Sequence, residues 1–139
     1  MQAHASEEVE QIALFQWARY AEQQFPELAL LHHIPNGGKR SKSEAARFKA
    51  AAVKAGVPDI ELPVARGGYF GLHIELKAGK NKTTAKQDEW LQALREQGRF
   101  CAVCYGWAEA MHTICAYLAY PPTEPKEEYY EAESSTDNN

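Results

Sequence analysis

The chain has 139 residues, of which 45% are hydrophobic and 24% are charged, so its length fits one domain with a buried core. No apolar run approaches the roughly 20 residues of a membrane-spanning helix, and the acidic N-terminus is unlike a secretory signal, so we expect a soluble protein. The formal net charge of -4 argues at first sight against a nucleic-acid partner, and three cysteines do not indicate a disulfide framework.

The charge is distributed unevenly along the chain. Residues 121–139 hold six Asp and Glu against one Lys, whereas residues 36–99 hold 13 Lys and Arg against 7 Asp and Glu, a net charge of +6. We therefore expect a folded domain at residues 1–120 and an acidic, disordered tail at residues 121–139. The basic middle of the chain removes the objection to a polyanionic substrate.

In chain order, the first predicted element is an amphipathic helix at residues 7–24, with Ser6 as its N-cap. The apolar run at residues 28–34 predicts a strand, and the Asn-Gly-Gly sequence after it predicts a turn. Residues 43–55 are rich in alanine and predict a second helix, with Gly56 as the residue that follows its C-cap.

Two strands are predicted next, at residues 57–64 and 69–77. The glycine-rich sequence between them predicts an antiparallel hairpin. Thr84 and Gln87 then have the spacing of a capping box, which indicates the start of a helix at residues 84–97.

The last predicted elements are a strand at residues 100–105 and a helix at residues 107–120. The resulting order, α-β-α-β-β-α-β-α, predicts the α/β class with a mixed β-sheet flanked by helices. The tryptophans fall on apolar faces of the predicted helices, so we expect them in the core: Trp17, Trp90 and Trp107.

The clearest chemical pattern lies in the predicted hairpin. Alternation along its second strand gives Glu75 and Lys77 the same face, and antiparallel pairing brings Asp59 beside Glu75. Two converging carboxylates and a backbone carbonyl form an oxygen-rich site for a hard divalent cation. Such a cation polarises a phosphoryl oxygen and lowers the pKa of a bound water, which a neighbouring lysine can orient.

This pattern resembles the signature of the PD-(D/E)XK nuclease superfamily, because Pro58-Asp59 is followed 16 residues later by Glu75-Leu76-Lys77. The surrounding sequences are similar to the VRR-NUC branch, especially its small phage-type stand-alone members: IPNGGKR (34–40), GVPDI (56–60), YFGLHIELKAG (69–79) and KQDEWLQAL (86–94). The resemblance covers roughly residues 7–118. It implies a restriction-endonuclease-like fold, Mg²⁺ or Mn²⁺ without an organic cofactor, and the cytoplasm of a bacterial or phage-infected cell.

The resemblance also implies roles for individual residues in the hairpin. Asp59 and Glu75 would ligate the metal ion, with the backbone carbonyl of Leu76 as a third ligand. Lys77 would position or activate the attacking water. Gln87, on the following helix, would contact that water or a phosphate, although its capping box explains it equally well.

A glutamate on the first helix is also expected to help close the metal site. The early Glu-rich helix that contains Gln11 is also similar to the VRR-NUC branch, and Glu7 is favoured because it lies four residues before Gln11 and so shares its helix face. Glu10 is the alternative.

Basic and amide side chains near this pattern are expected to hold the DNA backbone. They are Asn36, Lys39, Arg40, Lys42, Lys80, Lys82 and Lys86. Simpler explanations exist for single residues, since lysines often belong to a solvated loop, Asp59 could cap a turn, and Glu75 and Lys77 could form an exposed ion pair. Their combination in this order favours catalysis.

The sequence therefore predicts a divalent-metal-dependent, structure-specific DNA endonuclease. The resemblance implies branched DNA as substrate, including four-way Holliday junctions, and a homodimer, which would pair two active sites for two strands. The alternatives are a nicking, restriction-type or repair nuclease, a non-catalytic DNA-binding module, and a small protein-interaction domain.

Overall fold

The computed structural model describes residues 6–35 and 41–124, and its central element is a fully buried strand, β3 (Leu72–Lys77). This strand pairs antiparallel with β2 (Ile60–Leu62) and parallel with β4 (Phe100–Tyr105). A short edge strand, β1 (His32–His33), pairs antiparallel with β2. The sheet therefore has the order β1-β2-β3-β4, and both the predicted hairpin and the predicted mixed sheet are confirmed.

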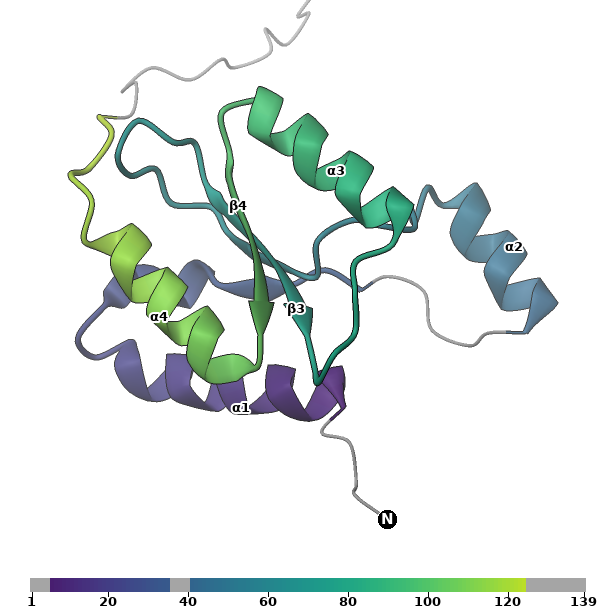
Figure 1. The fold of residues 1–139 in the computed structure, drawn as a ribbon, viewed down its shortest axis with the longest axis horizontal. Helices are drawn as coiled ribbons and strands as arrows, with labels where there is room; N and C mark the ends of the chain where they lie inside the picture. Colours follow the sequence, from purple (N-terminus) through teal and green to yellow (C-terminus); the bar gives the residue numbers. More distant parts are fainter. Residues whose placement is uncertain (1–5, 36–40, 125–139) are drawn as a thin grey trace, which may run out of the picture.

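Helices cover both faces of the sheet (Figure 1). On one face lie α1 (Glu7–Ala21) and α4 (Trp107–Leu118), which enclose the hydrophobic core with alternate side chains of β3: Leu72, Ile74 and Leu76. On the other face lies α3 (Ala85–Glu96). The remaining side chains of β3 face this helix, so the strand has one apolar and one polar face.

The tryptophans do not all lie in the core. Trp17 and Trp107 pack against the core cluster, as expected, but Trp90 on α3 does not belong to it. The prediction for Trp90 was therefore wrong, because an apolar stripe on a helix does not reveal which part of the stripe the neighbouring elements cover.

The predicted strand at residues 28–34 is mostly a 3₁₀ helix, Pro26–Leu30, and only β1 is extended. Proline fixes its φ near the helical value and is favoured in a first helical turn. Three residues per turn bring both Leu28 and Leu31 into the core, whereas Leu30 is 52% exposed. A strand would have placed Leu28 and Leu30 on the same face.

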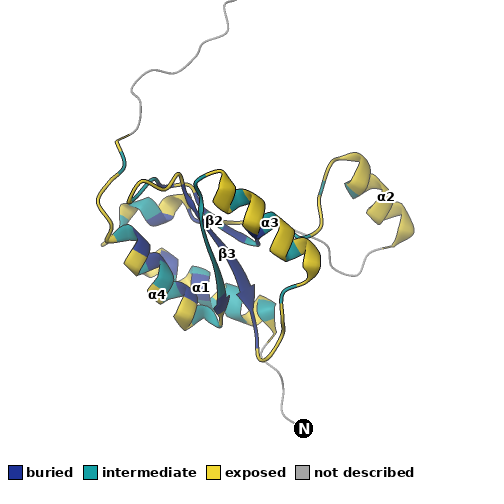
Figure 2. Cartoon of the chain, turned by 45° about the horizontal axis from the view of Figure 1, so that its top comes forward, coloured by how far each residue is buried: buried dark blue, intermediate teal, exposed yellow. Residues whose placement is uncertain are grey.

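The second predicted helix is shorter than expected. α2 (Lys42–Ala50) has no buried residue and stands apart from the sheet (Figure 2). Ala52 closes it in a left-handed conformation (φ 63°), with hydrogen bonds from Ala52 N to Lys49 O (3.1 Å) and from Val53 N to Phe48 O (2.8 Å). Ala52, rather than the predicted Gly56, is thus the residue after the C-cap.

Gly56 instead allows a close contact between two backbone segments. Its φ is +92°, and a Cβ atom there would lie 2.7 Å from the carbonyl oxygen of Lys86. The segment that leads into β2 therefore packs directly against the first turn of α3, which only glycine permits.

Of the remaining elements, β4 begins and ends as predicted, whereas β2 and β3 each begin three residues later than expected, β2 ends two residues earlier and α1 ends three residues earlier. Ser6 caps α1, and Thr84 and Gln87 form the predicted capping box. All three cysteines are free. No helix among residues 6–35 and 41–124 combines the length and hydrophobicity of a membrane span. Most of the predicted tail, residues 125–139, lies outside the described residues.

We expect Gly56→Ala to lower the free energy of unfolding by about 2–5 kcal/mol, from left-handed strain and a backbone clash together. Gly68→Ala is the matched control, because Gly68 also has a positive φ (+84°) but no atom within 4 Å of the added Cβ. Strain alone should cost this control about 1–2 kcal/mol. Urea unfolding of both variants measures the difference, and equal losses would show that the Gly56–Lys86 contact yields without cost.

Candidate active site

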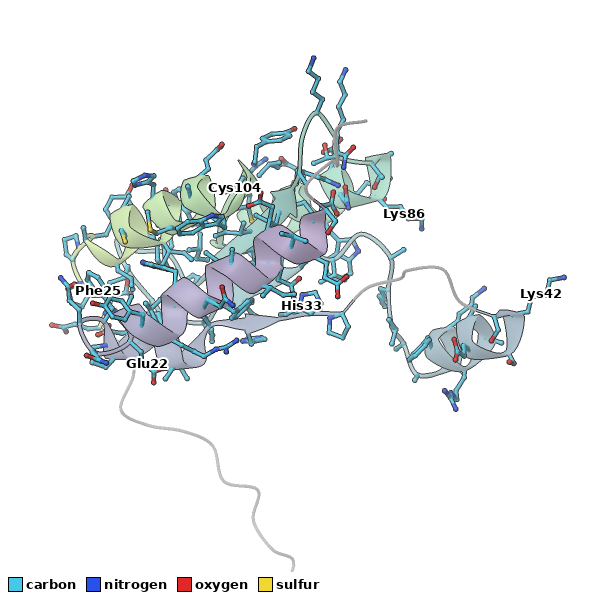
Figure 3. The ribbon with its side chains drawn as sticks, turned by 90° about the horizontal axis from the view of Figure 1, so that it is seen from below. Glu22, Phe25, His33, Lys42, Lys86 and Cys104 are labelled. Atoms are coloured by element: carbon cyan, nitrogen blue, oxygen red, sulfur yellow. The ribbon has the colours of Figure 1, made fainter. Side chains whose placement is uncertain are left out.

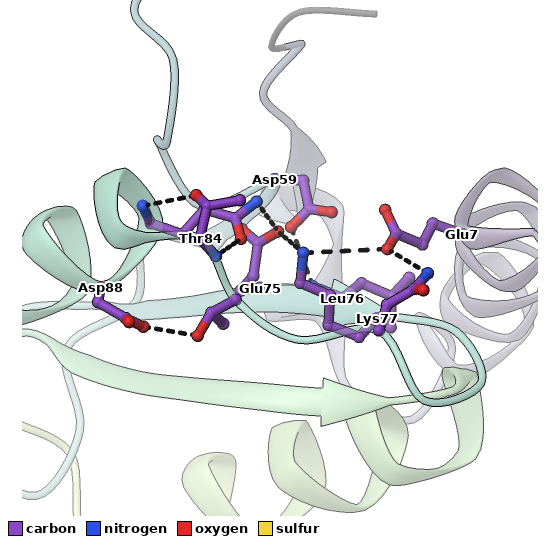
Figure 4. A network of polar contacts seen from close by, with 10 residues as sticks. Glu7, Asp59, Glu75, Leu76, Lys77, Thr84 and Asp88 are labelled. Carbon is purple, nitrogen blue, oxygen red and sulfur yellow. Dashed lines mark hydrogen bonds and ion pairs between the residues drawn. The ribbon is translucent and has the colours of Figure 1, made fainter.

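The candidate site lies at the C-terminal end of β3, on its polar face. His73, Glu75 and Lys77 are 5%, 2% and 5% exposed, respectively. The register Ile60↔Ile74 extends by one residue to place Asp59 opposite Glu75. The hairpin thus brings together the two carboxylates that the sequence predicts (Figure 4).

Asp59 immediately precedes β2 and is held by hydrogen bonds from two other segments. Its Oδ1 accepts a hydrogen bond from Leu76 N (3.0 Å), and its own carbonyl accepts one from Ile34 N (2.7 Å). Burial raises the pKa of Asp59, against the opposing effect of the Leu76 N–H.

The backbone of β3 supplies a third oxygen. The Lys77 carbonyl accepts a hydrogen bond from Gly106 N (2.9 Å), on the β4 side of the strand. Because successive residues direct their backbone groups to alternate sides, the Leu76 carbonyl faces the opposite side, where Leu76 N binds Asp59.

Only one of the two carboxylate oxygens of Glu75 has a hydrogen-bond partner among the described residues. Its Oε1 accepts a hydrogen bond from Gln87 Nε2 (3.0 Å) and lies 3.6 Å from Lys77 Nζ. Its Oε2 is buried and has no hydrogen-bond partner among the described residues. Burial, followed by the negative charge of Asp59, raises the pKa of Glu75 to about 8, although Lys77 opposes the shift.

Lys77 links the strand to the first helix. Its Nζ lies 3.9 Å from Glu7 Oε1, and the same oxygen accepts a hydrogen bond from Asn81 Nδ2 (3.3 Å). Asn81 was not predicted, since an asparagine between two lysines in a loop carries no sequence signal of such a contact. The network therefore joins β3, α1 and the loop that precedes α3.

Gln87 does two things at once. Its Oε1 accepts a hydrogen bond from Thr84 N (2.9 Å) in the capping box, while its Nε2 reaches Glu75. The predicted capping box is therefore present, and the same side chain contacts Glu75 rather than only the helix terminus.

Glu10 lies elsewhere. Its Oε2 accepts a hydrogen bond from Trp107 N (2.8 Å), at the N-terminus of α4. A carboxylate there satisfies a free N–H group and the positive end of the helix dipole. The structure thus brings Glu7 to Lys77 and uses Glu10 to join α1 to α4.

The residues that are predicted to bind the DNA backbone divide into three groups. Lys80, Lys82 and Lys86 are exposed along the loop after β3 and the first turn of α3. Lys42 begins α2, away from the sheet, as Figure 3 shows. Asn36, Lys39 and Arg40 lie outside the described residues.

A divalent cation fits this donor set. Burial raises the pKa of both carboxyl groups, and one oxygen of Glu75 lacks a partner among the described residues, so a cation would neutralise the charge and occupy that oxygen. In the described part of the chain, no group of three His, Cys, Asp or Glu side chains has metal-binding geometry. The candidate donors are therefore two carboxylates and the Leu76 carbonyl, which suits an ion such as Mg²⁺ that keeps several waters.

Comparisons with known proteins match most of the chain, including the residues of the candidate site. A model of the VRR-NUC domain family matches residues 3–108. A solved structure described as a VRR_NUC domain protein has 31% sequence identity and a TM-score of 0.74, over 88% of this chain and 94% of that chain. No curated protein matches the chain.

We expect stability to depend on pH through Glu75. Folding raises its pKa from 4.5 to about 8, so its stabilisation is fully present below pH 4.5 and is lost as the pH rises through 8. Without divalent cations, Glu75→Gln should flatten this decline, which is on the order of 1 kcal/mol per unit of pKa shift. Urea unfolding from pH 5 to 9 measures it, with the exposed Glu96→Gln as control. Parallel profiles for Glu75→Gln and wild type would contradict the assignment.

Glu7 and Glu10 should differ in their effect on the fold. Glu10→Ala removes the cap of α4 and should lower the free energy of unfolding by about 1–2 kcal/mol. Glu7→Ala should cost less, because Glu7 is 40% exposed in its contact with Lys77. Thermal or urea unfolding compares them, and the reverse order would exchange the two assignments.

Proposed function

The chain belongs to the VRR-NUC domain family, and we propose that its nuclease-type domain is a Mg²⁺- or Mn²⁺-dependent endonuclease that hydrolyses phosphodiester bonds in DNA. The observation that carries the proposal is the arrangement at the end of β3. Asp59, Glu75 and the Leu76 carbonyl meet there beside the buried ammonium group of Lys77.

Asp59, Glu75 and the Leu76 carbonyl would hold the cation. When bound, the cation supplies stabilisation of the negative charge that develops on the phosphate and lowers the pKa of water. Gln87 holds Oε1 of Glu75 through a hydrogen bond, which leaves the unpartnered Oε2 for the ion.

Lys77 is the residue that would act on the nucleophile. Its ammonium group is held between Glu75 Oε1, at 3.6 Å, and Glu7 Oε1, at 3.9 Å. As a hydrogen-bond donor it would orient the attacking water and stabilise negative charge as the bond to phosphorus forms. Glu7 would act by positioning Lys77, and Asn81 by holding Glu7.

The surface beside the site suits a nucleic acid. The loop and first helical turn that follow Lys77 carry Lys80, Lys82 and Lys86, none of which forms a described ion pair. Their ammonium groups would bind phosphates on either side of the scissile bond.

Branched DNA, including four-way junctions, is the substrate class that we propose within this activity, together with a homodimer. One described domain contains one such site, so coordinated cleavage of two strands needs a second copy of the chain. Rates on a four-way junction, a flap and a linear duplex of the same sequence distinguish this specificity from a nicking or restriction-type activity.

We expect cleavage to require Mg²⁺ or Mn²⁺ and to stop with a chelator. Asp59→Asn and Lys77→Ala should each lower the rate by at least about 100-fold, because each removes charge stabilisation from the reacting groups. Glu7→Gln should have an intermediate effect, and its neighbour Glu8→Gln should have none. A gel assay on labelled branched DNA measures these rates, with circular dichroism as the check on folding. Undiminished cleavage by folded Lys77→Ala would overturn the mechanism.

A further inference from the structure

Trp90 marks a pocket beside the candidate active site. This half-buried indole lies outside the core cluster and lines a hollow of about 390 Å³. That volume falls within the roughly 300–1,000 Å³ of ligand pockets. Its lining also includes Ile34, Pro35, Val53, Lys54 and Val57.

Three residues that line the pocket are linked to residues of the candidate site. Ile34 donates its backbone N–H to the carbonyl of Asp59, at 2.7 Å. Val57 lies two residues before Asp59, and Trp90 lies one turn after Gln87, which touches Glu75. The lining of the pocket is therefore joined to the segments that carry Asp59 and Glu75.

The walls and the rim differ in chemistry. The walls are aliphatic apart from the indole, whereas Lys54 contributes a positive charge. Lys86 adds a second charge nearby, because it lies one turn before Trp90 on the same side of α3 and its backbone contacts Gly56. The hollow on the other side of Trp90 is bounded by Glu89, whose carboxylate would repel phosphate.

We propose that this pocket binds one unpaired nucleobase of the DNA substrate, next to the phosphate at the Asp59–Glu75 site. The base packs against Trp90 and the aliphatic walls, and Lys54 and Lys86 bind the flanking phosphates. A flat apolar ring attached to a polyanion is the ligand that matches both the walls and the charges. Because every base has a π face, the pocket selects an unpaired nucleotide rather than a sequence.

This inference rests on the proposed nuclease function and makes it more specific. In a continuous duplex every base is stacked and paired, and extracting one costs a few kcal/mol. A branch point, flap or bulge presents an unpaired base without that cost. The pocket thus provides a physical reason for a preference for branched or interrupted DNA.

The test compares two DNA duplexes that each carry one bulged nucleotide, either thymidine or an abasic residue. Binding is measured by fluorescence anisotropy with Ca²⁺ in place of Mg²⁺. Wild type should bind the thymidine bulge at least about 5-fold more tightly, the lower end of the roughly 5- to 150-fold that stacking of one base contributes. Trp90→Ala should bind both duplexes equally, and Trp90→Phe should keep part of the preference.

Tyr20→Ala is the matched control, since it removes an aromatic side chain that is 79% exposed on α1 and lies outside this pocket. It should leave the preference unchanged. Equal binding of both duplexes by wild type, or an unchanged preference in folded Trp90→Ala or Trp90→Phe, would overturn the inference. So would a change from dimer to monomer in Trp90→Ala, measured by light scattering, because the pocket would then be a protein interface.

DNA substrates with and without the unpaired base also separate this inference from the nuclease proposal. Cleavage of branched DNA by wild type without any effect of the missing base would overturn the pocket alone. A base-dependent affinity without cleavage of any DNA in either Mg²⁺ or Mn²⁺ would overturn the nuclease function and leave the pocket as a binding site.

Discussion

The structure depends on one electrostatic constraint, which is that two carboxyl groups and an ammonium group share the end of a buried strand. Asp59 and Glu75 stand opposite each other, and both have raised pKa values because the protein removes water from around them. Lys77 compensates only part of this charge. A buried group of charges contributes little to the stability of an apolar sheet, and buried groups with shifted pKa values are concentrated at functional sites.

The elements around this strand are joined to it by few but specific contacts. Two consecutive amides, at Gly106 and Trp107, bind the Lys77 carbonyl and the Glu10 carboxylate, and so connect the end of β3 to α1. On the other side, the close approach of Gly56 to Lys86 connects the start of β2 to α3. Glu7 and Gln87 therefore reach the site from two helices whose positions are set independently of the charges themselves.

Much of this could be predicted from the sequence where the signal is local. The capping box of Thr84 and Gln87 depends on three residues of spacing, and the pairing of Asp59 with Glu75 depends on a single hairpin. Other features depend on tertiary contacts. Neither the contact of Asn81 with Glu7 nor the contact of Glu10 with Trp107 is encoded in spacing, because each is decided by where α1 meets α4 and the loop. The end of α2 was missed for a local reason, since an alanine rarely adopts the left-handed conformation found at Ala52.

The isolation of α2 has a thermodynamic consequence for the wall of the Trp90 pocket. Nine residues are too few for a helix to be stable alone in water, and α2 buries none of its side chains. Its backbone should open locally at a small fraction of the global unfolding free energy, and its amide hydrogens should exchange with solvent long before those of β3. Since the turn that ends α2 supplies Ala52 and Val53 to the pocket, we expect that wall to open independently of the strand that holds Glu75. The site would thus combine a rigid half, which sets the chemistry, with a half that can adapt to the shape of what it binds.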